Sequence, residues 1–212
     1  MNKKLIIFDM DGVLFDSTKL VGDFFLSKYP TMTTEIMNEI LTGNFHDELE
    51  KFKFTNKHIE ETPEEHKARS EKYSQDKSQV PLYKGIKELL KELHKNEYIL
   101  TINTSAFERN CLPLLKSVDI DNLFDFVATA EISKNKVEKF KIIEEKYSVS
   151  KDEMLFITDT LGDIREADFA EIPTIAVTWG AHDRKYFNRE PHNNLIAICD
   201  SVEELGKLIK GI

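Results

Sequence analysis

The chain opens with a short apolar run that leads directly into a pair of carboxylates. Residues 5–8 read Leu-Ile-Ile-Phe, and Asp9 and Asp11 follow with one residue between them. Four apolar residues without alternation are typical of a strand buried on both faces, as in parallel sheets. Gly12 can turn the chain sharply, so that both carboxylates face one point. Like charges this close require a cation or a proton, and hard carboxylate oxygens favour Mg²⁺.

A second acidic element has the same construction. Residues 154–158 form another apolar run, which ends at Asp159, and Asp163 follows four residues later. Either element alone is compatible with a solvated turn or a helix N-cap, and Asp163 in particular could cap a helix that runs to Ala170. Open parallel sheets bind ligands beyond the carboxyl ends of their strands. The two elements together therefore favour one acidic site at that edge.

Composition and charge limit the class of protein. The chain has 212 residues, of which 41% are hydrophobic, enough for one sizeable core and a smaller appendage. The apolar runs are too short for a membrane span or a signal peptide, so we expect a cytoplasmic protein with no membrane partner. A net charge of −9 disfavours nucleic acid as a partner. Small anionic substrates are compatible with that charge, because one metal ion and one lysine can reverse its sign locally, and a monomer is the default expectation.

The order of apolar patterns predicts an α/β core with an insertion. From residue 81 onward, apolar runs alternate with amphipathic segments, which is typical of a parallel sheet covered by helices. Strands are expected at 98–102, 124–129, 154–158, 174–179 and 195–199, and helices at 86–93, 107–118, 137–147 and 201–209. The residues before them show only helical patterns, at 20–29, 35–41, 47–54 and 63–77. We therefore expect a core of residues 1–16 and 81–212 and an inserted helical cap of residues 17–80.

The two acidic motifs carry a resemblance to a known family. Asp-Met-Asp-Gly-Val-Leu-Phe-Asp-Ser at residues 9–17, with Ile-Thr-Asp-Thr-Leu-Gly-Asp at 157–163, resembles the haloacid dehalogenase-like hydrolase superfamily, in its phosphoglycolate phosphatase and β-phosphoglucomutase-like subgroup with a helical cap. The resemblance covers roughly residues 5–17 and 81–205. It implies a Rossmann-like parallel sheet of strand order 3-2-1-4-5, and a cap that closes over the site. In that order the strands that end at Asp9 and Asp159 are neighbours.

Two further motifs of the family have candidates here. Residues 98–105 are similar to the motif that ends in a phosphate-binding Thr or Ser, and Thr104 is the best match, with Ser105 and Asn103 as alternatives one position away. The family also has a lysine, for which Lys134 fits the spacing from downstream and Lys136 the spacing from upstream. We prefer Lys136 because it immediately precedes an amphipathic segment. Surface lysines and a capping role for Thr104 are the alternatives.

The resemblance implies a role for each candidate residue. Asp9 would attack phosphorus and form an aspartyl-phosphate, and Asp11 would act first as acid and then as base. Mg²⁺ would be held by Asp9, by Asp159 and by the main-chain carbonyl of Asp11, with Asp163 bound directly or through water. Thr104 and the lysine would bind phosphate oxygens. The lysine would also hold Asp9 ionised at neutral pH.

A Mg²⁺-dependent phosphatase acting on small phosphate monoesters is therefore the predicted function. Asp11 disfavours a dehalogenase, which lacks this second Asp, and a phosphonate-cleaving relative, which usually has a small residue there. A phosphomutase of the β-phosphoglucomutase type would use the same residues, and a non-catalytic phospho-acceptor or binding module is the third alternative. The substrate stays open among phosphoglycolate, sugar phosphates, nucleotides and pyrophosphate.

Overall fold

The protein is built on one parallel sheet, seen in a computed structural model that describes residues 4–211. The six strands lie in the order β3-β2-β1-β4-β5-β6, and each pair of neighbours is parallel. They are β1 (Leu5–Phe8), β2 (Ile99–Asn103), β3 (Phe126–Ala128), β4 (Met154–Thr158), β5 (Thr174–Val177) and β6 (Leu195–Cys199). The predicted order 3-2-1-4-5 is confirmed, and the sixth strand adds to the edge of β5.

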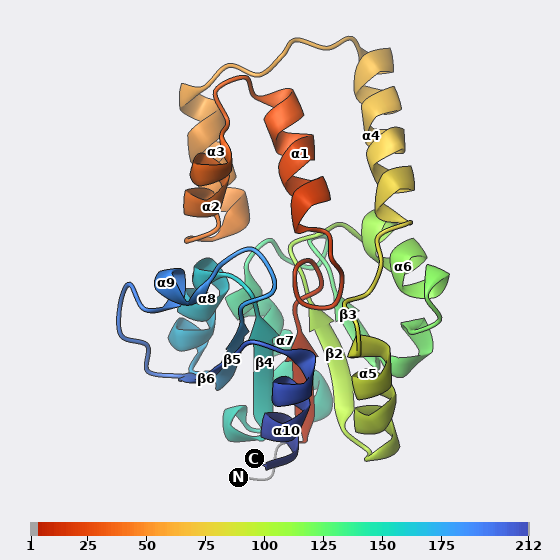
Figure 1. Cartoon of the computed structure of the whole chain (residues 1–212), viewed down its shortest axis with the longest axis vertical. Coiled ribbons are helices and arrows are strands. Elements are labelled where there is room, and N and C mark those ends of the chain that lie inside the picture. Colours follow the sequence, from red (N-terminus) through yellow and green to blue (C-terminus); the bar gives the residue numbers. More distant parts are fainter. Residues whose placement is uncertain (1–3, 212) are drawn as a thin grey trace.

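Helices cover both faces of the sheet and one of its ends (Figure 1). They are α1 (Thr18–Lys28), α2 (Thr34–Ile40), α3 (Phe45–Thr55), α4 (Pro63–Lys77), α5 (Ile86–Lys95), α6 (Glu108–Ser117), α7 (Lys136–Tyr147), α8 (Leu161–Ala170), α9 (Arg184–Phe187) and α10 (Val202–Gly211). Most predicted helices are present close to their expected bounds. Helix α8 was expected only if Asp163 capped it, and α9 was not predicted. In the described part of the chain, no helix has the length and apolar character needed to cross a membrane.

The central strand β1 is apolar throughout because helices cover both of its faces. Ile6 and Phe8 pack into the apolar cluster that includes residues of α5, α6 and α10, whereas Leu5 and Ile7 pack into the cluster on α7 and α8. All four side chains are fully buried. A strand covered on both faces has no position for a polar side chain, so polarity begins only where the strand ends.

The four helices α1 to α4 lie together beyond the carboxyl ends of the strands, and we refer to residues 18–77 as the cap (Figure 1). The cap has its own apolar cluster, which includes Tyr29, Met37 and Leu49. Helix α4 begins as predicted because Thr62 and Glu65 form a capping box around its first turn. The cap therefore lies over the edge of the sheet at which the acidic motifs are expected.

Candidate active site

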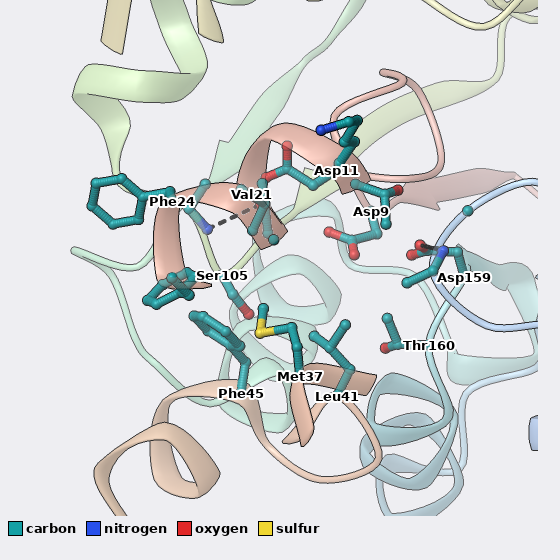
Figure 2. Close-up of a pocket in the computed structure, with 18 of the residues that line it drawn as sticks. Asp9, Asp11, Val21, Phe24, Met37, Leu41, Phe45, Ser105, Asp159 and Thr160 are labelled. Carbon is teal, nitrogen blue, oxygen red and sulfur yellow. Dashed lines mark hydrogen bonds between the residues drawn. The ribbon is translucent and has the colours of Figure 1, made fainter. Parts of the chain in front are cut away.

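The register of the sheet brings the separate motifs to one edge. Phe8 of β1 is paired with Ile102 of β2 and with Ile157 of β4, so the residues that follow each strand emerge side by side. A cavity of about 620 Å³ lies between this edge and the cap. The predicted site residues that line it are Thr104, Lys136 and Asp163, together with Asp9, Asp11, Ser105 and Asp159. Figure 2 labels the last four. Residues far apart in the sequence thus share one cavity, as the topology predicts.

A single buried lysine lies between two carboxylates at the floor of this cavity. The Lys136 Nζ is 2.6 Å from Oδ2 of Asp163 and 3.1 Å from Oδ2 of Asp9. The backbone N–H of Met10 donates to Oδ1 of Asp9 at 2.8 Å, and the Thr158 hydroxyl donates to Oδ2 of Asp163 at 2.6 Å. Lys136 is only 1% exposed. The Lys136 ammonium group therefore forms ion pairs with both aspartates.

Burial and Lys136 act in opposite directions on the carboxylates at the floor of the cavity. Burial raises the pKa of Asp9 well above its usual range, and the nearby Lys136 opposes that rise without cancelling it. Burial also raises the pKa of Asp159, to about 7. For Asp163, burial acts in the same direction, but Lys136 and Thr158 outweigh it and hold the pKa below its usual value. Lys136 thus acts on Asp9 in the predicted direction, and a further cation at this floor would favour the ionised carboxylate more strongly.

The surroundings of Asp159 fit such a cation. Its Oδ2 accepts a hydrogen bond from the backbone N–H of Ala181 at 2.7 Å, whereas its buried Oδ1 has no hydrogen-bond partner among the described residues. A Cβ on Gly12 would lie 2.0 Å from Oδ2 of Asp159, and one on Gly180 would lie 2.2 Å from the same atom. Gly12 also has a φ of +76°, which favours glycine. The two glycines leave room around a carboxylate that has an unused oxygen.

The donor set suits Mg²⁺ in particular. Within residues 4–211, no three His, Cys, Asp or Glu side chains form a ready metal cage. Mg²⁺ needs no such cage, because it commonly keeps several waters and binds one or two carboxylates with substrate phosphate. Asp9 and Asp159 can supply those carboxylates. Oδ2 of Asp163 is engaged by Lys136 and Thr158, which indicates that this residue positions the lysine.

Asp11 is held by the cap, which the sequence did not predict. Its Oδ2 accepts a hydrogen bond from Lys77 Nζ at 2.7 Å, and its Oδ1 accepts one from the Ser17 hydroxyl at 2.5 Å. Lys77 ends helix α4 and is 1% exposed. Burial favours its neutral form, but Asp11 and Tyr73 outweigh burial and raise the pKa of Lys77 above its usual value. A charged lysine of the cap therefore contacts the candidate acid of the core.

The structure distinguishes between the two candidate lysines. Lys136 begins helix α7, whose N-cap is Asn135, and its side chain points into the site. Lys134 lies before that cap, is exposed and does not line the cavity. Only Lys136 is therefore placed where it could contact a phosphate group.

The residues after β2 have separate positions. The hydroxyl of Thr104 accepts a hydrogen bond from Ala106 N at 3.1 Å, and Thr104 is buried at the cavity. Ser105 lines the same cavity, and its carbonyl accepts a hydrogen bond from His46 of the cap at 3.1 Å. Asn103 points elsewhere, since its side-chain amide donates to the carbonyl of Lys136 at 3.2 Å. Thr104 and Ser105 are thus the candidates that reach the cavity.

A second buried lysine, Lys139, supports this loop and was missed in the sequence. Its Nζ donates to the carbonyl of Thr104 at 2.6 Å, and burial lowers its pKa to about 8. It follows Lys136 by three residues, so both lie on one face of α7. The three-residue spacing from Lys136 in a predicted helix was the feature of the sequence that could have indicated a second lysine near the site.

The turn between α2 and α3 attaches the cap to the core. The carbonyl of Leu41 accepts a hydrogen bond from Gly162 N at 3.0 Å, and a Cβ on Gly162 would lie 2.1 Å from the carbonyl oxygen of Gly43. The side chain of Asn44 donates to Oε1 of Glu166 at 2.9 Å. The same oxygen accepts the backbone N–H of Lys136 at 3.0 Å. One carboxylate oxygen therefore connects the cap to the start of α7.

A buried histidine joins the cap to the core at a neighbouring point. Nδ1 of His182 accepts a hydrogen bond from the backbone N–H of Leu161 at 3.0 Å, so the ring proton is on Nε2, which donates to the carbonyl of Asn38 at 2.9 Å. The ring stacks on Tyr186 with the centroids 4.1 Å apart. These contacts require the neutral form of the ring.

The stability of the protein should therefore depend on pH through His182. Burial lowers its pKa in the folded chain, whereas the unfolded chain takes up the proton near pH 6.5. Its contribution to stability is thus present above about pH 6.5 and is lost as the pH falls below that value. We expect the free energy of unfolding to fall more steeply between pH 7 and pH 5 in the wild type than in His182→Gln. Urea titrations across this range measure both slopes, and equal slopes would contradict the prediction.

The fold and the site together define a capped α/β enzyme with an acidic site at the carboxyl edge of a parallel sheet. The chain belongs to the haloacid dehalogenase-like hydrolase family, whose model matches residues 6–177. The family predicted from the two acidic motifs is thereby confirmed.

Known relatives agree with this membership. The chain is 26% identical over 193 residues to a phosphoglycolate phosphatase of Aliivibrio fischeri, which covers 84% of this chain and 85% of that protein. It is 22% identical over 219 residues to the pyrophosphatase PpaX of Halalkalibacterium halodurans, covering 97% and 98% of the two chains. Among solved structures, a hydrolase from Pseudomonas syringae has a TM-score of 0.79 at 19% identity and covers 99% of both chains. The last likeness shows the shared fold.

Proposed function

We propose that this protein is a Mg²⁺-dependent phosphatase that hydrolyses small phosphate monoesters through an aspartyl-phosphate intermediate. The observation that carries the proposal is the placement of Asp9 at the floor of the cavity, 3.1 Å from the ammonium group of Lys136. The relatives named as a phosphoglycolate phosphatase and a pyrophosphatase support phosphoryl chemistry. Action in the cytoplasm on a soluble metabolite belongs to the same proposal.

In this proposal the side chains divide the two steps of hydrolysis between them. Asp9 attacks phosphorus, and the bond to the leaving oxygen breaks as the aspartyl-phosphate forms. Asp11 protonates the leaving oxygen and then accepts a proton from the water that hydrolyses the intermediate. Lys136 and the loop at Thr104 hold phosphate oxygens. Asp11 must release Lys77 before it can act as an acid, which links its role to the cap.

Asp9, Asp159 and the main-chain carbonyl of Asp11 would hold Mg²⁺, which would neutralise charge on the phosphoryl oxygens. The unpartnered Oδ1 of Asp159 supports this assignment. The raised pKa of Asp9 is consistent with it, because added positive charge nearby would favour the ionised form of this buried carboxyl group.

A phosphate-release screen over a panel of metabolite monoesters tests the proposal. We expect release with Mg²⁺, loss of release with EDTA and recovery when Mg²⁺ is restored in excess. A sugar 1-phosphate in the panel separates the phosphatase from the phosphomutase. Formation of sugar 6-phosphate without free phosphate would contradict the phosphatase, as would unchanged release in EDTA.

A further inference from the structure

The side of the cavity formed by the cap carries a group of apolar side chains among polar ones. Val21 and Phe24 of α1, Met37 of α2, Leu41 just after it and Phe45 of α3 point into the cavity across from the acidic residues (Figure 2). The volume of about 620 Å³ is in the range of small-molecule sites. A substrate whose phosphate lies at Asp9 would therefore place its leaving group against these side chains.

Aromatic rings continue around this side of the cavity as a chain of contacts. Ring centroids lie 4.4 Å apart for Tyr73 and Phe24, 5.3 Å for Phe24 and Phe25, 5.5 Å for Phe25 and Phe45, 5.4 Å for Phe45 and His46, and 6.3 Å for His46 and Phe107. Burial lowers the pKa of His46 and outweighs its hydrogen bond to the carbonyl of Ser105, so the neutral ring is favoured. The rings offer faces and edges to which another ring could pack.

The cations that line the cavity are engaged or exposed. Lys136 is bound to Asp9 and Asp163, and Lys77 is bound to Asp11. Lys19 pairs with Asp23 at 2.5 Å and is 85% exposed. The fourth is Arg109, an exposed residue whose guanidinium lies 5.0 Å from the centre of the Phe107 ring. Among the lining residues that the structure describes, none therefore offers a buried, unpaired cation to a second anionic group.

We infer that the substrate is the monophosphate ester of an aromatic alcohol, without a second anionic group; this inference rests on the proposed phosphatase function. A carboxylate or second phosphate on the leaving group would be desolvated against rings and Met37 without a buried cation as its partner, which is costly. An uncharged ring would instead exchange water for packing against the rings of the cap. The class differs from phosphoglycolate and pyrophosphate, the compounds named for the two relatives.

A matched pair of esters tests the inference. Benzyl phosphate and 4-carboxybenzyl phosphate have similar leaving alcohols and differ in one carboxylate remote from phosphorus. We expect kcat/KM to be about 100-fold higher for benzyl phosphate, as for other sites that reject an unpaired polar group. Phosphoglycolate and pyrophosphate, measured in the same buffer with Mg²⁺, should also be poorer substrates than benzyl phosphate.

A change in the apolar wall should move this preference. Met37→Lys places a cation on a side chain of similar length, and we expect it to reduce the ratio of the two kcat/KM values at least tenfold, on the order of one well-placed charge pair. Met37→Leu keeps an apolar side chain of similar volume and should retain the preference. Circular dichroism of both variants verifies that the cap remains folded.

The possible results distinguish a failure of the aromatic-substrate inference from a failure of the proposed phosphatase function. Equal or better hydrolysis of the carboxylated ester by the wild type would overturn the inference and leave the phosphatase standing. An unchanged ratio in a folded Met37→Lys variant would also overturn it, because the wall would then not contact the leaving group. Absence of phosphate release from every ester would overturn the phosphatase itself, and the inference with it.

Discussion

Replacement of Asp9 by Asn should lower the rate of phosphate release by about 10⁴-fold or more, the scale seen when a catalytic nucleophile is removed. Asn has nearly the same shape, and its oxygen can still accept the hydrogen bond from Met10 N. Lys136 keeps its shorter contact to Asp163 at 2.6 Å. The loss should therefore come from chemistry alone.

Stability should not follow activity in this variant. Since burial raises the pKa of Asp9, ionised Asp9 opposes folding at neutral pH, and neutral Asn should leave the free energy of unfolding unchanged or raise it. Mass spectrometry after acid quenching should detect a phosphorylated peptide containing Asp9 in the wild type and none in Asp9→Asn. Full turnover in the variant would show that another group attacks phosphorus.

Replacement of Lys136 by Met should impair both activity and stability. Its Nζ contacts Asp9 and Asp163, both buried, so its removal leaves two carboxylates without their cation. Breaking a buried pair in this way costs about 3–5 kcal/mol of unfolding free energy. The loss should shrink as the pH falls, because protons then neutralise the carboxylates. Phosphate release should fall about 10³-fold, since positioned charges of this kind supply much of the catalysis.

Lys134→Met is the matched control, because it removes the same charge two residues away. Lys134 is exposed and outside the cavity, so the free energy of unfolding of the Lys134→Met variant should differ from that of the wild type by no more than about 0.5 kcal/mol. Urea denaturation and a phosphate-release assay of both variants give the comparison. Equal losses in the two variants would contradict the assignment of Lys136 to the site.

The centre of the sheet was predictable because strands such as β1 and β4 are buried on both faces. Short continuous apolar runs such as residues 5–8, followed by acidic residues, are typical of buried strands in a parallel sheet. The acidic residues mark where each strand ends. Helix α8 was harder, because residues 161–170 include Gly162 and three acidic residues, and its apolar residues show little helical periodicity. Helix α9 is a single turn that begins at the N-cap Asp183, too short for periodicity to be seen.

The site was predictable where a strand end fixes it and unpredictable where tertiary packing does. Asp9, Asp159 and Thr104 follow strands, so their convergence depends on topology alone. Lys77 is different, because nothing in the polar helix α4 distinguishes it from Lys72, which forms an exposed pair with Asp76. The choice between Lys134 and Lys136 could have been made from Asn135, an N-cap residue that places Lys136 in the first turn of the following helix.

The contacts of the turn between α2 and α3 limit how far this cap is interchangeable. Gly162 must lack a side chain for the turn to approach, and Glu166 bonds both Asn44 and the backbone N–H of Lys136. A cap grafted from a relative would therefore have to match helix α8 as well as the two chain junctions. Recombination at the junctions alone would exchange the cavity-facing surface of the cap and at the same time remove the Asn44 hydrogen bond to Glu166. Under the proposed function, exchanging substrate selection between relatives would therefore require moving the cap and α8 as one unit.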